Sequence, residues 1–196
     1  MKAKSLVMLT LGGLATVATV LGTAALIKFD VTPGLPSRAP LRWPSDTKVT
    51  RSFGHPQIVV FAHPLCSCTR ATLTELEQLP GTSITVEFFR PGSGSTWAKS
   101  ATWDAARQSL GASVAWDDEG REAKRFGSGT SGTVLLYSAK GELLFEGGVT
   151  PSRGHGGENF GFTNLAEALR TEKPQNTTRP VFGCGLFNAQ ALGVVL

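Results

Sequence analysis

A short apolar run, QIVVFA at residues 57–62, places the strongest constraint on how this chain folds. The run is continuous and rich in β-branched residues, which is typical of a central strand buried on both faces. Such a strand has to be covered on both sides, so the run predicts a sheet flanked by helices. Directly after it come two cysteines separated by one residue, Cys66 and Cys68, and then a helical pattern.

The segments that follow alternate between helical and strand patterns. Leucines on one face predict a helix over residues 66–80, which Pro80 ends. Alternating apolar residues predict a strand over 82–89. The remaining patterns predict a helix at 96–110, a strand at 112–116, a helix at 121–127, a hairpin of strands at 133–137 and 142–148, and a helix at 163–170. Strands that alternate with helices and then end in a hairpin indicate an α/β fold with a mixed sheet.

The N-terminal part carries a second strong signal, because residues 5–27 contain no charged side chain. A helix of roughly 20 apolar residues is long enough to cross a bilayer core. Lys2 and Lys4 precede it, and the positive-inside tendency then keeps the N-terminus in the cytoplasm. A cleaved signal peptide is the alternative, but the run ends in ALIKFD, a poor cleavage site. We therefore expect residues 1–28 to form a cytoplasmic tip and a single-pass cell-membrane anchor, with the domain on the extracytoplasmic (periplasmic) side.

The rest of the chain divides into a linker, a domain and a tail. Residues 29–56 contain five prolines, and proline-rich segments are stiff and extended, which predicts a linker. The alternative is a segment that wraps the domain and is anchored by Trp43 and Phe53. The domain is expected over residues 57–171, and a tail that ends in apolar residues over 172–196.

Charge and loop composition exclude some classes of partner. The whole chain has 19 basic and 15 acidic residues, and removing the anchor's Lys2, Lys4 and Lys28 leaves 16 basic against 15 acidic. The exported part therefore has no basic excess that would favour nucleic acid. The glycine-rich stretch at 147–162 lacks the Lys-Ser/Thr ending of a phosphate-binding loop, so the sequence predicts no nucleotide site.

The strand, the cysteine pair at a helix start and the order of the later elements resemble the thioredoxin superfamily over residues 57–171. Four motifs are also similar to an exported bacterial group of thioredoxin-like proteins, some labelled RedB: HPLCSCTRA, TSGTVLLY, GGVTPSRGHGG and PVFGC. The resemblance implies a thioredoxin-like mixed β-sheet flanked by helices, preceded here by one N-terminal transmembrane helix. It also implies thiol–disulfide oxidoreductase activity.

Two features depart from the thioredoxin pattern. Thioredoxins have two residues between their cysteines, whereas this chain has one. Thioredoxins also place a cis-proline before the hairpin strand that faces the cysteines, whereas the matching stretch here, GTSGTV at 129–134, has none. In that superfamily the proline helps to hold the substrate backbone and keeps metals away from the cysteines. Its absence therefore bears on both substrate handling and metal exclusion.

The cysteine pair predicts redox chemistry. A helix start offers unpaired N–H groups and a partial positive charge, which stabilise a thiolate. Arg70 adds a nearby cation, and His63 either orients the turn or accepts a proton. We expect Cys66, within reach of solvent, to attack and Cys68 to resolve, although a disulfide between them closes a small and strained ring. The alternative is a pair of buried and inert cysteines.

The same sulfurs allow a metal-binding hypothesis. Thiolate-rich sites suit copper(I) and zinc, and Cys66, Cys68, His155 and Cys184 would be the ligands of a copper- or zinc-delivery module. Under the redox hypothesis no cofactor is needed, and Cys184 is then a second resolving thiol or a small buried residue. The expected partners are exported proteins that carry thiols or disulfides, or a membrane reductant. A third possibility is a redox-inactive domain that only binds a partner.

Overall fold

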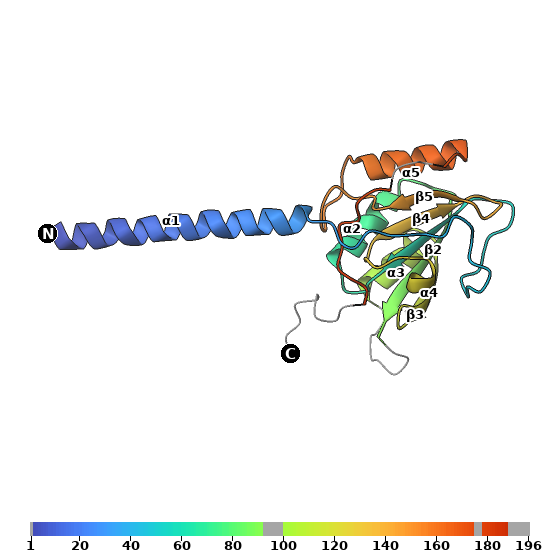
Figure 1. Ribbon diagram of the computed structural model, residues 1–196, viewed down its shortest axis with the longest axis horizontal. Helices are drawn as coiled ribbons and strands as arrows, with labels where there is room; N and C mark the ends of the chain where they lie inside the picture. The colour runs from blue at the N-terminus through green and yellow to red at the C-terminus, as the bar shows by residue number, and fades with distance from the viewer. Residues whose placement is uncertain (1, 92–99, 175–177, 188–196) are drawn as a thin grey trace. The chain divides into compact units, whose positions relative to one another are not determined.

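The computed structural model describes residues 2–91, 100–174 and 178–187, with side chains from residue 7 onward. The chain divides into two compact units, Met1–Thr32 and Pro33–Leu196. The first unit is one helix, α1 (Lys2–Val31), drawn in blue in Figure 1. Its segment Val7–Val31 is long and apolar enough to cross a membrane, and no other helix in the described ranges is. The predicted apolar helix is thus present, and it runs to Val31.

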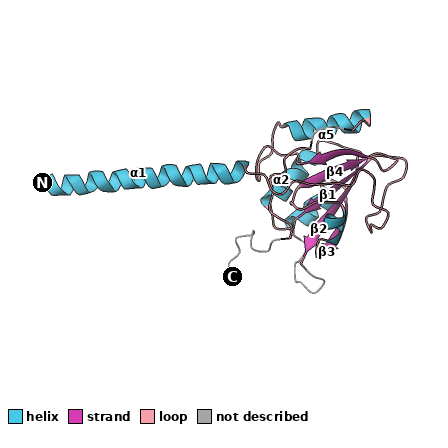
Figure 2. Cartoon of the chain, viewed as in Figure 1, coloured by secondary structure: helices cyan, strands magenta, loops and turns pink. Residues whose placement is uncertain are grey.

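The second unit is built on one five-stranded sheet, with the strand order β3-β2-β1-β4-β5 (Figure 2). The central strand β1 is parallel to β2 and antiparallel to β4. β3 extends the parallel side and β5 the antiparallel side. The strands are β1 (Gln57–Ala62), β2 (Ser83–Arg90), β3 (Ser113–Asp118), β4 (Thr133–Tyr137) and β5 (Leu143–Gly147). This mixed sheet, with its terminal hairpin and flanking helices, confirms the predicted thioredoxin-like fold class.

The helices of this unit are α2 (Ser67–Leu76), α3 (Ala101–Gln108), α4 (Arg121–Arg125) and α5 (Phe160–Thr171). α3 begins at Ala101 because the Ser100 side chain caps it, accepting a hydrogen bond from the Trp103 N–H. The first residues predicted for this helix, 96–99, lie outside the described residues. α5 begins three residues before the predicted start because the Asn159 side chain caps it.

The core lies on both faces of β1, which is buried at every position, as its continuous apolar run predicted. Ile58 and Val60 pack into a cluster that contains side chains of α2, α3 and α5. Val59 and Phe61 pack into a second cluster on the other face, with α4. Each such side chain contributes roughly 1.5–3 kcal/mol when fully buried. The carboxyl end of β1, where the chain turns into α2, is therefore held from both sides.

The proline-rich segment does not project from the domain as a linker. Three backbone N–H groups within residues 34–43 donate hydrogen bonds to carbonyl groups of the domain. Trp43 packs edge-on against Phe126 and Tyr137, whereas Phe53 is exposed. The linker prediction is wrong for this segment, because burial of an aromatic ring and these hydrogen bonds hold it against the sheet. The alternative of a wrapped segment, with Trp43 as its anchor, describes it better.

Three carboxyl groups are buried on the α4 side of the sheet: Glu87, Asp117 and Glu122. Glu87 lies on β2, next to Phe61 in the strand register. Burial, together with the nearby charges of Asp117 and Glu122, raises the pKa of Glu87 to about 7. The folded protein therefore keeps a proton on Glu87 at pH values where the unfolded chain has already lost it.

Replacement of Glu87 by glutamine tests this cluster. Between about pH 4.5 and 7 the folded state binds more protons than the unfolded state, so the wild type loses stability as the pH rises. The Glu87→Gln variant lacks this titration. We expect it to be more stable than the wild type at pH 8, by up to about 3 kcal/mol, with the difference vanishing near pH 4.5. Urea unfolding in detergent micelles across this pH range measures it. Glu77→Gln, an exposed change on α2, is the control, and an equal gain there would contradict the prediction.

Candidate functional site

The turn from β1 into α2 carries the cysteine pair. Cys66 is the N-cap residue of α2, and Cys68 lies in the first turn. Both side chains are buried, with 5% and 3% of their surface exposed, and both are free thiols. The predicted position at the helix start is confirmed, but the expectation that Cys66 is open to solvent is wrong. A segment from the end of the chain lies against it, as described below.

His63 shapes this turn. Its backbone N–H donates to the Ser131 hydroxyl, and its carbonyl accepts from the Thr69 hydroxyl and from the Cys66 N–H. Its ring Nδ1 accepts from the Leu65 N–H, which leaves the proton of the neutral ring on Nε2. Burial lowers the pKa of His63, and the charge of Cys66 opposes that change. These contacts favour the role of His63 in orienting the turn, one of the two roles that the sequence allowed, and its part in the chemistry stays a prediction.

The third cysteine completes a cluster of thiols. Cys184 is half-buried, and its Sγ lies 3.6 Å from Sγ of Cys66, within hydrogen-bond distance. The two residues are 118 positions apart in the chain. Cys68 also interacts electrostatically with both of these sulfurs. Cys184 thus faces the pair, and its role as a second resolving thiol or a metal ligand stays a prediction.

Backbone pairing holds Cys184 in place. The Ser131 N–H donates to the Cys184 carbonyl at 2.8 Å, and the Leu186 N–H donates to the Gly129 carbonyl at 2.9 Å. Thr130 and Gly185 form an antiparallel bridge between these two bonds. Residues 129–131 belong to the GTSGTV stretch that lacks a proline. A proline at Ser131 would have no N–H to donate, so the missing proline permits this pairing.

Glycines let the surrounding backbones come close. A Cβ on Gly183 would lie 1.8 Å from the Ser131 carbonyl oxygen, so only glycine fits there without a shift. Arg153, in the glycine-rich loop, donates a hydrogen bond from Nη1 to the Gly183 carbonyl. Gly154 of the same loop lies against Ser67, the residue between the paired cysteines. The loop thus contacts both sides of the thiol cluster.

The electrostatics of the cluster favour the thiolate of Cys66. Hydrogen bonds from the thiols of Cys184 and Cys68 lower the pKa of Cys66 most, and the N–H groups of Cys68 and Thr69 add to this. Neither N–H makes a regular capping bond to Sγ, so both act as oriented dipoles at the helix start. Hydrogen bonds with Cys184 and Cys66 raise the pKa of Cys68. The hydrogen bond with Cys66 also raises the pKa of Cys184, while the Cys68 thiol and the charge of Arg153 act in the opposite direction without cancelling that rise.

Two predicted site residues lie apart from the thiols. Arg70 is exposed on α2, and no interaction among the described residues joins it to a cysteine, so its catalytic role stays a prediction. Arg153 is the cation that interacts with the cluster, and the sequence signalled it only through its position in the glycine-rich loop. His155 is exposed, and its Nδ1 interacts with Ser152 Oγ and the Arg153 carbonyl of its own loop.

The metal hypothesis stays a prediction. Within residues 2–91, 100–174 and 178–187, no group of three or more His, Cys, Asp or Glu side chains is arranged to hold a metal ion. His155 belongs to a different hydrogen-bond network from Cys66, Cys68 and Cys184. The thiols lie close together, but their contacts are those of hydrogen-bonded thiols.

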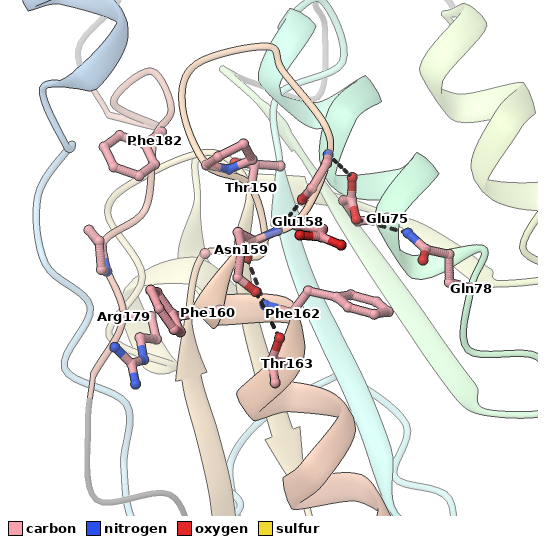
Figure 3. A pocket seen from close by; sticks show the side chains of 15 residues that line it. Glu75, Gln78, Thr150, Glu158, Asn159, Phe160, Phe162, Thr163, Arg179 and Phe182 are labelled. Atoms are coloured by element: carbon pink, nitrogen blue, oxygen red, sulfur yellow. Dashed lines mark hydrogen bonds between the residues drawn. The ribbon is translucent and has the colours of Figure 1, made fainter.

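A cavity of about 960 Å³ is lined by residues of α2, of the start of α5 and of the segment that leads to Cys184 (Figure 3). Phe160 and Phe182 line it, together with the carboxyl group of Glu75. Glu75 accepts hydrogen bonds from the Gly157 N–H and the Gln78 side chain, which ties the glycine-rich loop to α2. The lining contains no cysteine and no histidine, so the reactive groups lie at the thiol cluster.

Three solved structures match the chain, and the first two have TM-scores above 0.5, which shows a shared fold. An uncharacterized conserved protein from Geobacillus kaustophilus has a TM-score of 0.55 at 14% identity, over 80% of this chain and 92% of that one. A hypothetical protein from Sinorhizobium meliloti 1021 has a TM-score of 0.52 at 15% identity, over 80% and 94%. A secreted Mycobacterium tuberculosis disulfide oxidoreductase homologous to E. coli DsbE has a TM-score of 0.40 at 14% identity, over 61% and 83%.

Likenesses at this level of identity show the fold alone. No protein family matches the sequence, and no curated protein is similar to it. The chain thus shares its fold with these proteins, and the resemblance of its cysteine motif to the RedB-like group stays a prediction.

Replacement of Gly183 by alanine tests whether the paired segment covers Cys66. The added methyl group collides with the Ser131 carbonyl, so the segment has to shift and the site opens more often. We expect alkylation of Cys66 to become at least ~10-fold faster, as local opening becomes easier. Mass spectrometry of the alkylated Cys66 peptide measures this rate. Gly129→Ala is the matched control, because its Cβ would make only an ordinary contact, 3.5 Å from Leu35 Cδ1. Equal rates in both variants and the wild type would refute the covering role.

Proposed function

We propose that this protein is a thiol–disulfide oxidoreductase in which Cys66 is the nucleophile. The observation that carries the proposal is the placement of the Cys66 sulfur. It lies at the start of α2 and in hydrogen-bond contact with a second thiol. Thiolates, not thiols, attack disulfides, and a lowered pKa provides the thiolate at neutral pH. The direction of the pKa of Cys66 is therefore the direction that this chemistry needs.

The reaction balances with the protein's own groups. The Cys66 thiolate attacks one sulfur of a substrate disulfide, which forms a mixed disulfide and releases the other substrate sulfur as a thiolate that takes up a proton. A second protein thiol then loses its proton and attacks the Cys66 sulfur. A protein disulfide forms, and the remaining substrate sulfur leaves as a thiolate. Two electrons pass from the protein to the substrate, and the reverse sequence oxidises a substrate dithiol. The sequence assigned the second step to Cys68.

The finer parts of the proposal concern place and partners. α1 supports a membrane anchor by its length and composition, and the lysines before it favour an extracytoplasmic domain. The substrates are then exported proteins that carry disulfides or thiols, with an external dithiol or a membrane reductant to regenerate the protein. The cysteines carry the electrons themselves, so no organic cofactor is required.

Replacement of Cys66 by serine tests the proposal. We expect the variant to lose catalysis of disulfide exchange to the background level, because serine is not a nucleophile toward disulfides at neutral pH. Reduction of a protein disulfide by dithiothreitol, with catalytic amounts of the full chain in detergent micelles, measures this activity. Ser67→Ala, an exposed change between the two cysteines, is the control and should keep the activity. A wild type that catalyses no exchange, or a C66S variant that does, would contradict the proposed function.

A second readout tests the thiolate. In the wild type, alkylation of Cys66 should stay fast at pH values well below about 8.5, the ordinary pKa of a cysteine. Cys68→Ala removes one of the hydrogen-bond donors and should move this pH profile upward, whereas Cys68→Ser keeps a donor and should move it less. Equal profiles in all three proteins would show that Cys68 does not stabilise the Cys66 thiolate.

A further inference from the structure

We propose that Cys184, rather than Cys68, is the resolving thiol, so that the oxidised protein carries a disulfide between Cys66 and Cys184. This proposal rests on the proposed function and adds a catalytic residue to it. It concerns which sulfur attacks Cys66 in the second step of the reaction. The three cysteines of the chain allow only three pairings, so the question has a definite answer.

Distance and direction favour Cys184. The sulfurs of Cys66 and Cys184 are 3.6 Å apart, and a disulfide bond requires about 2.05 Å. A small movement of one side chain closes that gap. Since the two residues come from separate segments, no short ring restricts how their side chains meet. This is the one thiol–thiol hydrogen bond of regular geometry within the described ranges.

The local chain geometry works against Cys68. Cys66 is the N-cap of α2 and Cys68 occupies its second helical position, so both sulfurs belong to one stretch of three residues. A bond between them closes a ring with only Ser67 in between, which forces the disulfide away from its relaxed geometry. Cys68 instead serves Cys66 as a hydrogen-bond donor, a positioning role that needs no bond formation.

The segment around Cys184 is fixed in position, which an intramolecular reaction with Cys66 requires. Two backbone hydrogen bonds and a bridge pair residues 184–186 with residues 129–131. The Arg153 side chain holds the Gly183 carbonyl. The Gly132 N–H in turn donates to the Phe61 carbonyl at the end of β1. A continuous chain of backbone contacts thus fixes Cys184 relative to the strand that leads into Cys66.

Formation of the mixed disulfide also lowers the pKa of Cys184, which favours its thiolate. The hydrogen bond with Cys66 is the largest cause that raises the pKa of Cys184. Once the Cys66 sulfur is part of a mixed disulfide, it carries no charge and that cause is lost. Arg153 remains beside Cys184 and favours its thiolate. Cys184 therefore becomes a better nucleophile at the step in which it would act.

The step itself is balanced. The Cys184 thiol gives its proton to solvent, and its sulfur attacks the Cys66 sulfur of the mixed disulfide. The bond between Cys66 and the substrate sulfur breaks, and the substrate leaves as a thiolate that is protonated by water. The protein's two thiols are oxidised by two electrons, and the substrate disulfide is reduced by two. An external dithiol, such as dithiothreitol in the assay, returns the Cys66–Cys184 disulfide to two thiols.

Disulfide mapping of the wild type tests this proposal. The full chain in detergent micelles is oxidised with glutathione disulfide, its free thiols are alkylated, and it is digested with trypsin without reduction. Trypsin leaves Cys66 and Cys68 on one peptide, which ends at Arg70, and Cys184 on another. We expect the two peptides to be linked, with Cys68 alkylated. A disulfide within the first peptide, with an alkylated Cys184, would overturn the proposal.

Matched variants give a second readout that needs no mapping. In Cys184→Ser we expect the mixed disulfide with glutathione to persist, and its resolution to slow by at least ~10-fold, because an intramolecular reaction has been removed. In Cys68→Ser, which keeps a hydrogen-bond donor, the mixed disulfide should still resolve at least ~10-fold faster than in Cys184→Ser. The opposite pattern would overturn the proposal. A C184S variant that is misfolded by circular dichroism leaves the decision to the wild-type map.

The proposal and the function on which it rests fail in different ways. A wild type that forms no mixed disulfide and catalyses no exchange would refute the function itself. Catalysis with a Cys66–Cys68 disulfide would refute only the role of Cys184.

Discussion

The backbone pairing between residues 129–131 and residues 184–186 is the contact on which the site depends. Without it, Cys66 would be a lone thiol at a helix start, open to solvent as the cysteine pair alone suggested. With it, a third thiol lies within hydrogen-bond distance of the Cys66 sulfur, the thiolate of Cys66 is favoured, and the paired segment covers Cys66. The pairing requires a residue with an N–H at position 131 and a residue without a side chain at position 183. Both conditions are met by residues that depart from the thioredoxin pattern or lie outside the predicted domain.

A buried thiolate is expensive unless donors surround it. Here the donors are two thiols and the N–H groups of the first helical turn. The turn belongs to α2, which packs in the core, and backbone pairing holds Cys184. His63 and Ser131 connect the turn to the segment before β4, so the geometry of the donors is set by hydrogen bonds, not by flexible surface side chains. The histidine of the turn is neutral, and the cation of the cluster, Arg153, lies on the side of Cys184.

Much of the fold could be predicted from the sequence, because it rests on local signals. The continuous run of β1 and the alternation along β2 follow from side-chain periodicity, and the hairpin follows from its turn. Of the site, only the part formed by residues close together in the sequence could be predicted. The sequence showed the spacing of Cys66 and Cys68 and the start of the helix. The approach of Cys184, in contrast, depends on a pairing between segments more than 50 residues apart. Nothing periodic marks such a pairing. The glycines beside Cys184 and the missing proline were the only sequence features that indicated this pairing. Similarly, five prolines suggested a free linker, but Trp43 and its hydrogen bonds hold that segment against the sheet.

The wrapped segment has a practical consequence for work on the isolated domain. The Gly34 N–H donates to the Val181 carbonyl, and the Thr130 hydroxyl donates to the Leu35 carbonyl. The first residues after α1 therefore form hydrogen bonds with both segments that pair near Cys184, the one that contains Thr130 and the one that contains Val181. A soluble fragment cut at the predicted domain start, residue 57, would lack these hydrogen bonds even though every strand of the sheet were intact. Expression boundaries that keep residues 33–187 together preserve the neighbourhood of the thiols as it is in the full chain.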